Sequence, residues 1–171
     1  MKKLILGFVA GAALGGFIGF AGGIFIFPYW FPPPPAMEAV ANLAEQKVLA
    51  QGDFIHANPS DPVHWGKGKV TLYENKAGDR LVHLEDSFEV GPGPRFHVYV
   101  VDRAEVRSNA DFLAAKSTDL GRLRSFRGSQ NYPVPVGVKL AEQKSVVVWC
   151  KEFGVLITPA TLARQGAAPT S

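Results

Sequence analysis

The single cysteine of this sequence, Cys150, carries its most reactive side chain. A lone thiol cannot form an intramolecular disulfide, so it acts as a packed side chain, a nucleophile, a redox thiol or a metal ligand. Thiolate chemistry needs a nearby cation or metal and some exposure, whereas other free cysteines behave as small buried hydrophobes. Lys151 is adjacent, but in a strand it points to the opposite face. The residues alone therefore favour a buried hydrophobe.

His97 is the histidine that could act together with Cys150, because imidazole and thiolate form an axial pair for haem iron or a copper site. No C-x-x-C-H haem-attachment motif is present. His97 also alternates with the apolar positions Phe96, Val98 and Val100, which favours a solvated or hydrogen-bonded histidine. The cofactor expectation stays open between a haem or copper-type metal at Cys150 and His97, and no cofactor.

Other motifs narrow the class of function. Trp149 and Tyr132 are predicted to pack in the core or at its rim. Arg122, Arg124 and Arg127 form a small basic loop, either solvated or in contact with anionic lipid or a partner. The sequence lacks a G-x-S-x-G motif, a phosphate loop and a zinc motif, so we expect neither a hydrolase nor a transferase.

The elements that must position these residues are mostly short strands. Three valines and a tryptophan make Ser145–Phe153 a buried strand, and Val155–Thr158 a second one that Pro159 should end. Residues 67–74 and 80–90 flank a turn at 75–78 and predict a hairpin. Further strands are expected at 48–56, 95–102, 118–123 and 130–134, and a short helix at 110–116. This pattern predicts a mainly β domain, an antiparallel, jelly-roll-like β-sandwich.

The amino terminus is of a different kind. Residues 4–27 carry no charge, and at ~1.5 Å per residue a helix of that length exceeds the ~30 Å hydrocarbon core. The run is longer than the apolar region of a cleaved signal peptide and ends in bulky aromatic residues, which favours a signal anchor. Lys2 and Lys3 precede it, and the next basic residue is Lys47. The expected topology is single-pass, with a cytoplasmic amino terminus and a periplasmic domain.

Five glycines recur at every fourth position of this helix: Gly7, Gly11, Gly15, Gly19 and Gly23. Such a stripe lets two helices approach closely in lipid. It predicts dimerisation, or docking onto other membrane or periplasmic proteins. The surface of the domain is expected to take part in such docking. Without Lys2 and Lys3 the chain has nearly equal numbers of basic and acidic residues, so we expect no nucleic-acid partner.

The predicted organisation has four parts. Residues 1–31 form the anchor, and 32–46 form a proline-rich spacer with a short helix over Met37–Gln46. Residues 47–163 form the β-sandwich, and 164–171 form a flexible tail.

Several short motifs of the β domain occur together in one known family. They are His97-Val98-Tyr99-Val100, Asp119-Leu120-Gly121, Gly128-Ser129-Gln130-Asn131-Tyr132 and Ser145-Val146-Val147-Val148-Trp149-Cys150. With them, the sequence resembles the DM-thirteen domain family, the electron-transfer DM domain that accompanies haem-binding DOMON domains. The resemblance covers about residues 51–162. It implies a β-sandwich-like fold and a redox role for Cys150, as a free thiol or as the holder of a prosthetic group. His97 matches the strand motif of the family and is the second ligand candidate, and Trp149, Tyr132 and Asn131 are expected to be supporting residues.

The leading hypothesis is therefore a membrane-anchored domain that serves an electron-transfer process through Cys150, within a larger assembly. It is more an accessory component than a stand-alone enzyme. The alternatives are a structural subunit of a membrane complex without redox chemistry, and a module that binds a small ligand.

Overall fold

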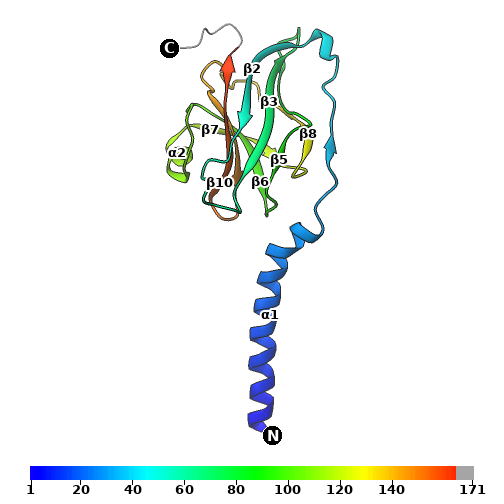
Figure 1. Cartoon of the computed structure of the whole chain (residues 1–171), viewed down its shortest axis with the longest axis vertical. Helices are drawn as coiled ribbons and strands as arrows, with labels where there is room; N and C mark the ends of the chain where they lie inside the picture. Colours follow the sequence, from blue (N-terminus) through cyan, green and yellow to red (C-terminus); the bar gives the residue numbers. More distant parts are fainter. Residues whose placement is uncertain (165–171) are drawn as a thin grey trace.

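A computed structural model describes residues 1–164 and shows a β domain with one long helix projecting from it (Figure 1). This helix, α1, spans Lys2–Trp30 and is long and apolar enough to cross a membrane. The rest of the chain buries none of its most apolar stretch. The apolar amino-terminal helix is thus confirmed, and it is a candidate membrane anchor.

Within residues 31–164, the domain holds eleven strands and one short α-helix. The strands are β1 (Ala36–Met37), β2 (Lys47–Phe54), β3 (Gly66–Glu74), β4 (Arg80–Leu84), β5 (Glu89–Val90), β6 (Phe96–Val101), β7 (Ser117–Arg122), β8 (Gly128–Pro133), β9 (Ser145–Cys150), β10 (Val155–Thr161) and β11 (Ala163–Arg164). Helix α2 spans Asn109–Ala114. The predicted hairpin is confirmed, because β3 and β4 pair from Val70↔Leu84 to Glu74↔Arg80.

The mainly β class is confirmed, but the antiparallel sandwich is confirmed only in part. The strands form one sheet in the order β1-β8-β4-β3-β2-β10-β9-β6-β7, with β11 and β5 attached beside it. β1 pairs with β8 in parallel, so the sheet is mixed. Strand β10 joins the two layers that a sandwich would keep separate, since it pairs with β9 on one side and with β2 on the other. The result is a sheet curled into a half-barrel (Figure 1).

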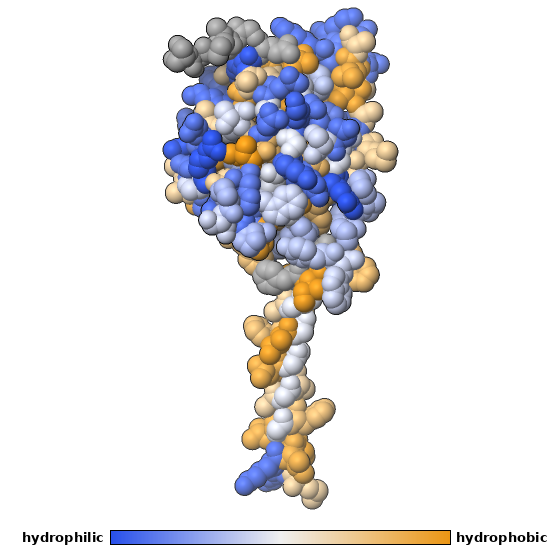
Figure 2. Space-filling model, viewed as in Figure 1, coloured by the Kyte–Doolittle hydropathy of each residue, from blue (hydrophilic) through white to orange (hydrophobic). Residues whose placement is uncertain are grey.

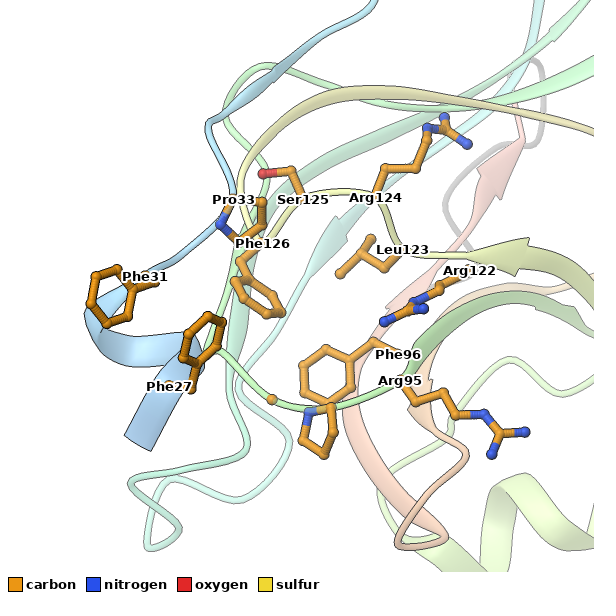
Figure 3. Close-up of a pocket in the computed structure, with 12 residues that line it drawn as sticks. Phe27, Phe31, Pro33, Arg95, Phe96, Arg122, Leu123, Arg124, Ser125 and Phe126 are labelled. Atoms are coloured by element: carbon orange, nitrogen blue, oxygen red, sulfur yellow. The ribbon is translucent and has the colours of Figure 1, made fainter. Parts of the chain in front are cut away.

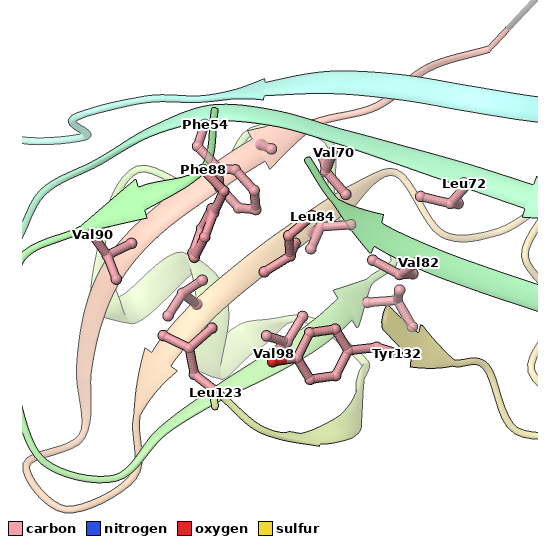
Figure 4. Packing of buried hydrophobic residues seen from close by; sticks show 14 of the residues in the cluster. Phe54, Val70, Leu72, Val82, Leu84, Phe88, Val90, Val98, Leu123 and Tyr132 are labelled. Carbon is pink, nitrogen blue, oxygen red and sulfur yellow. The ribbon is translucent and has the colours of Figure 1, made fainter. Parts of the chain in front are cut away.

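The concave side of this sheet encloses the main core. Side chains from both halves of the sheet meet there, among them Val70, Val82, Val98 and Tyr132 (Figure 4). A smaller cluster lies on the outer side of β6 and β9, where α2 covers Tyr99 and Trp149 with Phe112. Strands β6 and β9 are thus covered on both faces, which explains their nearly continuous apolar sequences.

The segment between α1 and β2 differs from the predicted spacer. The helix expected over Met37–Gln46 does not form; the segment holds β1 and a three-residue 3-10 helix, Leu43–Glu45. Tertiary contacts outweigh helix propensity here. The Ser125 hydroxyl donates to Pro34 O, and Arg124 forms two hydrogen bonds with the Glu38 carboxylate at 2.7 and 2.8 Å. The chain therefore runs along the side of the domain before it enters β2 at the end far from α1 (Figure 1).

Proline does not end the last long strand where the sequence suggested. Strand β10 continues through Pro159 to Thr161. Proline is tolerated because the Pro159 carbonyl still accepts a hydrogen bond from Ile55 N, while β2 pairs with β10 only at Ala160↔Phe54. The sheet extends to Arg164, and the rest of the tail predicted for residues 164–171 lies outside the described residues.

Candidate functional site

Strands β6 and β9 place the two main candidates, Cys150 and His97, on opposite faces of the sheet. Phe96 lies opposite Cys150, and His97 lies opposite Trp149. Side chains alternate along a strand, so Cys150 points into the main core while His97 and Trp149 point outward. The structure does not bring the thiol and the imidazole together.

Cys150 is almost completely enclosed, with 2% of its surface exposed. Its thiol donates a hydrogen bond to the carbonyl oxygen of Pro94, with a sulfur–oxygen distance of 3.2 Å. The surrounding side chains are apolar and include Phe96 and Val148. This geometry suits a neutral thiol as the donor.

A short loop, Gly91–Pro94, closes over the thiol. Gly93 is packed so tightly that a side-chain carbon there would lie 2.5 Å from the tip of the Phe96 ring. On its other side, the loop borders a cavity of about 440 Å³ (Figure 3). Pro94 both lines this cavity and holds the Cys150 thiol.

Asp119 on β7 organises the outer face. Its carboxylate accepts hydrogen bonds from His97 Nδ1 at 2.9 Å, Tyr99 Oη at 3.2 Å and Lys151 Nζ at 3.1 Å. The backbone N–H of Gly121 donates a further one at 2.9 Å. Burial opposes ionisation of Asp119, but these hydrogen bonds, led by that from His97, outweigh it and hold the pKa of Asp119 below its usual range.

Tyr99 links this polar cluster to the aromatic one. Burial first, and then the negative charge and hydrogen bond of Asp119, raise the pKa of Tyr99 to about 12. The Tyr99 ring meets Phe112 edge-on at 5.2 Å, and Phe112 stacks on Trp149 at 4.2 Å. Trp149 is thus held by packing, as its sequence predicted.

Tyr132 and Asn131 lie on β8, and Asn131 fastens the segment that follows α1. The Asn131 amide donates to Ala39 O at 2.8 Å, and Asn131 N donates to the Glu38 carboxylate at 2.8 Å. Tyr132 is buried, and the Arg124 guanidinium lies 4.5 Å from the centre of its ring. Their described contacts stabilise the domain.

The residues present do not fit one metal held by both Cys150 and His97. The two side chains project from opposite faces, and His97 is engaged with Asp119. Among the described residues, no group of three or more His, Cys, Asp or Glu side chains is arranged to hold a metal ion.

The sequence did not reveal the Asp119 cluster. His97 and Asp119 are 22 residues apart, and only the pairing of β6 with β7 brings them together. The one available signal was the strand alternation that places His97, Tyr99 and Lys151 on the face opposite Cys150.

Comparison with known proteins identifies one family. The family model described as "Electron transfer DM13" matches residues 59–162, which is more than half of the chain and includes strands β3 to β10. No curated protein and no solved structure matches the chain. The matched range contains Cys150, the loop that covers it and the Asp119 cluster, and so this chain belongs to the electron transfer DM13 family.

Proposed function

We propose that this chain is a membrane-attached electron-transfer domain on the periplasmic side of a bacterial membrane. The family match supports the electron-transfer class, and the apolar helix α1 supports attachment. Lys2 and Lys3 precede the helix and the next basic residue is Lys47, which favours a cytoplasmic amino terminus and an extracytoplasmic domain.

In this proposal the redox group is Cys150. The observation that carries it is the hydrogen bond from the Cys150 thiol to Pro94 O at 3.2 Å, which places the sulfur against the end of the Gly91–Pro94 loop. Displacing this short loop would expose the sulfur without moving a core strand. Loops open locally at a lower free energy than core strands do.

The chemistry requires a second thiol from another molecule, because the sequence contains one cysteine. When that thiol arrives as half of a disulfide, the Cys150 thiolate attacks one of its sulfurs, so that one S–S bond breaks, one S–S bond forms, and the displaced sulfur leaves as a thiolate that takes up the proton lost by Cys150. Reduction of the new disulfide by the displaced thiol reverses these steps. His97 takes no part as a ligand, since it lies on the other face of the sheet.

Thiol exchange with glutathione disulfide tests this function on the full chain in mild detergent. Cys150 should exchange with the disulfide to give a protein–glutathione mixed disulfide and free glutathione, seen as a mass increase in the folded protein. Gly93→Ala should accelerate the reaction, because the added carbon collides with the Phe96 ring and loosens the loop.

Val82→Ala is the matched control, since it removes core volume in β4. If Val82→Ala accelerates the reaction as much as Gly93→Ala does, exposure comes from unfolding of the whole domain and the loop has no role. If the folded wild-type chain forms no adduct while the urea-unfolded chain reacts readily, Cys150 is a packing residue only.

A second candidate function, an accessory subunit of a membrane complex, has support in α1. Nothing lies within 4 Å of a side-chain carbon built on Gly7, Gly11, Gly15 or Gly19. Figure 2 shows a pale stripe along the helix between apolar residues. An open stripe of this kind suits close packing against another helix.

Replacing stripe glycines in the full chain tests this role. Gly15→Ile and Gly19→Ile should weaken association in a membrane two-hybrid assay, while Ala13→Ile, placed about 200° around the helix from Gly15, should not. If Gly15→Ile and Gly19→Ile associate as strongly as Ala13→Ile and the wild type, the support for a subunit role is removed.

A further inference from the structure

A cavity of about 440 Å³ lies where α1 meets the β domain (Figure 3). Phe27 and Phe31 from the end of the helix line one side, and their ring centres are 5.1 Å apart. Residues from the loop after β7 and from the start of β6, including Leu123, Phe126 and Phe96, line the other side. The cavity thus combines membrane-anchor and domain residues.

The charged lining of the cavity is entirely basic. Arg95, Arg122 and Arg124 line it, and no Asp or Glu is among its lining residues. Two of these arginines have carboxylate partners: Arg95 pairs with Glu152 at 3.1 Å, and Arg124 pairs with Glu38. Arg122 has no side-chain partner among the described residues, and it extends between Leu123 and Phe96 (Figure 3). One guanidinium is therefore available to an anion.

The length of α1 sets the depth of the cavity. The uncharged stretch from Leu4 to Phe27 spans ~36 Å at ~1.5 Å per residue, against a hydrocarbon core of ~30 Å. Phe27 and Phe31 therefore reach the headgroup layer when the helix crosses a bilayer. The cavity opens at the level of the lipid phosphates.

We propose that this cavity binds the headgroup of an anionic phospholipid. The Arg122 guanidinium donates to the phosphate, and Phe27 and Phe31 pack against the glycerol backbone and the upper acyl chain. A free phosphate would gain only the contact with one solvent-exposed guanidinium, which is weak. The apolar half of the cavity therefore favours a lipid. This inference depends on insertion of α1 in a membrane and not on redox chemistry at Cys150.

Native mass spectrometry of the full chain, released from non-ionic detergent micelles, tests the proposal. The protein is mixed with equal amounts of dioleoyl phosphatidylglycerol and dioleoyl phosphatidylcholine. We expect one phosphatidylglycerol adduct to dominate. Arg122→Ala should reduce the ratio of the two adducts about tenfold, as expected for the loss of one charge-assisted hydrogen bond. Arg122→Lys should keep part of the preference.

Lys144→Ala is the charge-matched control, because Lys144 precedes β9 at the end opposite Cys150 and the cavity. It should leave the adduct ratio unchanged. Phe31→Ala should lower the occupancy of phosphatidylglycerol without a change of charge. Equal loss in Lys144→Ala and Arg122→Ala would show non-specific charge attraction and overturn the site. Adducts of glycerol 3-phosphate as abundant as those of the lipid would overturn the choice of a lipid.

Discussion

The two faces of β6 and β9 differ in the way they hold their reactive groups. On the inner face, Cys150 has apolar neighbours and one hydrogen bond, to Pro94 O. On the outer face, Asp119 accepts hydrogen bonds from three side chains and one backbone N–H. The same pair of strands thus presents a sealed thiol on one side and a partly solvated polar cluster on the other.

This difference places two kinds of environment on one pair of strands. The thiol is shielded from solvent, whereas the side chains of His97 and Asp119 in the outer cluster are 17% and 32% exposed. Substitutions on the outer face should therefore lower the free energy of unfolding more than substitutions at Cys150 do.

The largest effect is expected at Trp149. Trp149→Ala removes the stack on Phe112 and leaves a cavity under α2, and should lower the free energy of unfolding by about 3–5 kcal/mol. Urea denaturation followed by circular dichroism measures this change. Trp149→Phe keeps an aromatic ring on Phe112 and should cost about half as much or less. A loss below about 1 kcal/mol for Trp149→Ala would contradict a packed outer face.

Asp119→Ala should have the next largest effect. It leaves His97, Tyr99 and Lys151 without their shared acceptor and should cost about 1–3 kcal/mol. The same substitution removes the negative charge beside Tyr99 and should lower the pKa of Tyr99 from about 12, while burial keeps it above its ordinary value. Tyrosine NMR titration reports this pKa. An unchanged Tyr99 titration would show that burial alone controls this group.

Cys150→Ala should cost less, about 1 kcal/mol, because it removes one weak hydrogen bond and one sulfur atom from the core. Thermal unfolding in the same buffer provides the measurement. Cys150→Ser keeps a donor for Pro94 O and is the matched variant. If Cys150→Ala destabilises the domain more than Trp149→Ala does, the ranking of the two faces is wrong.

The smallest expected effect is a dependence of stability on pH, which is caused by Asp119 on the outer face. The pKa of Asp119 is lower in the folded than in the unfolded chain, so its contribution is complete above an unfolded value of about 4 and is lost as pH falls through the folded value. Relative to Asp119→Asn, the wild type should lose below about 1 kcal/mol of stability on acidification, since Asp119 is partly exposed. A wild-type advantage that grows toward pH 3 would have the wrong sign.

Local patterns in the sequence predicted most elements of this domain. Valine-rich runs predicted β6 and β9, and the turn at residues 75–78 predicted the hairpin of β3 and β4. The alternation around His97 also predicted that it lies on the face opposite Phe96. These features depend on neighbours within a few residues.

Long-range pairings could not be predicted in the same way. The parallel pairing of β1 with β8 joins residues about 90 positions apart, and it replaces a helix that local propensity favoured. The Asp119 cluster depends on the register of β6 with β7, which shifts between Val98 and Tyr99. The two halves of the sheet are joined because β10 pairs with β2, and no local motif predicts that pairing.

The pairing of β1 with β8 limits how far the domain can travel. Between the end of α1 at Trp30 and the hydrogen bond of Pro34 O with Ser125 there are only three residues, and each adds at most ~3.5 Å of reach. Such a linker does not permit a long swinging movement above the lipid surface. Under the proposed function, a membrane-bound electron partner would reach the domain by lateral diffusion, and the frequency of their encounters should scale with the density of both proteins in the bilayer plane.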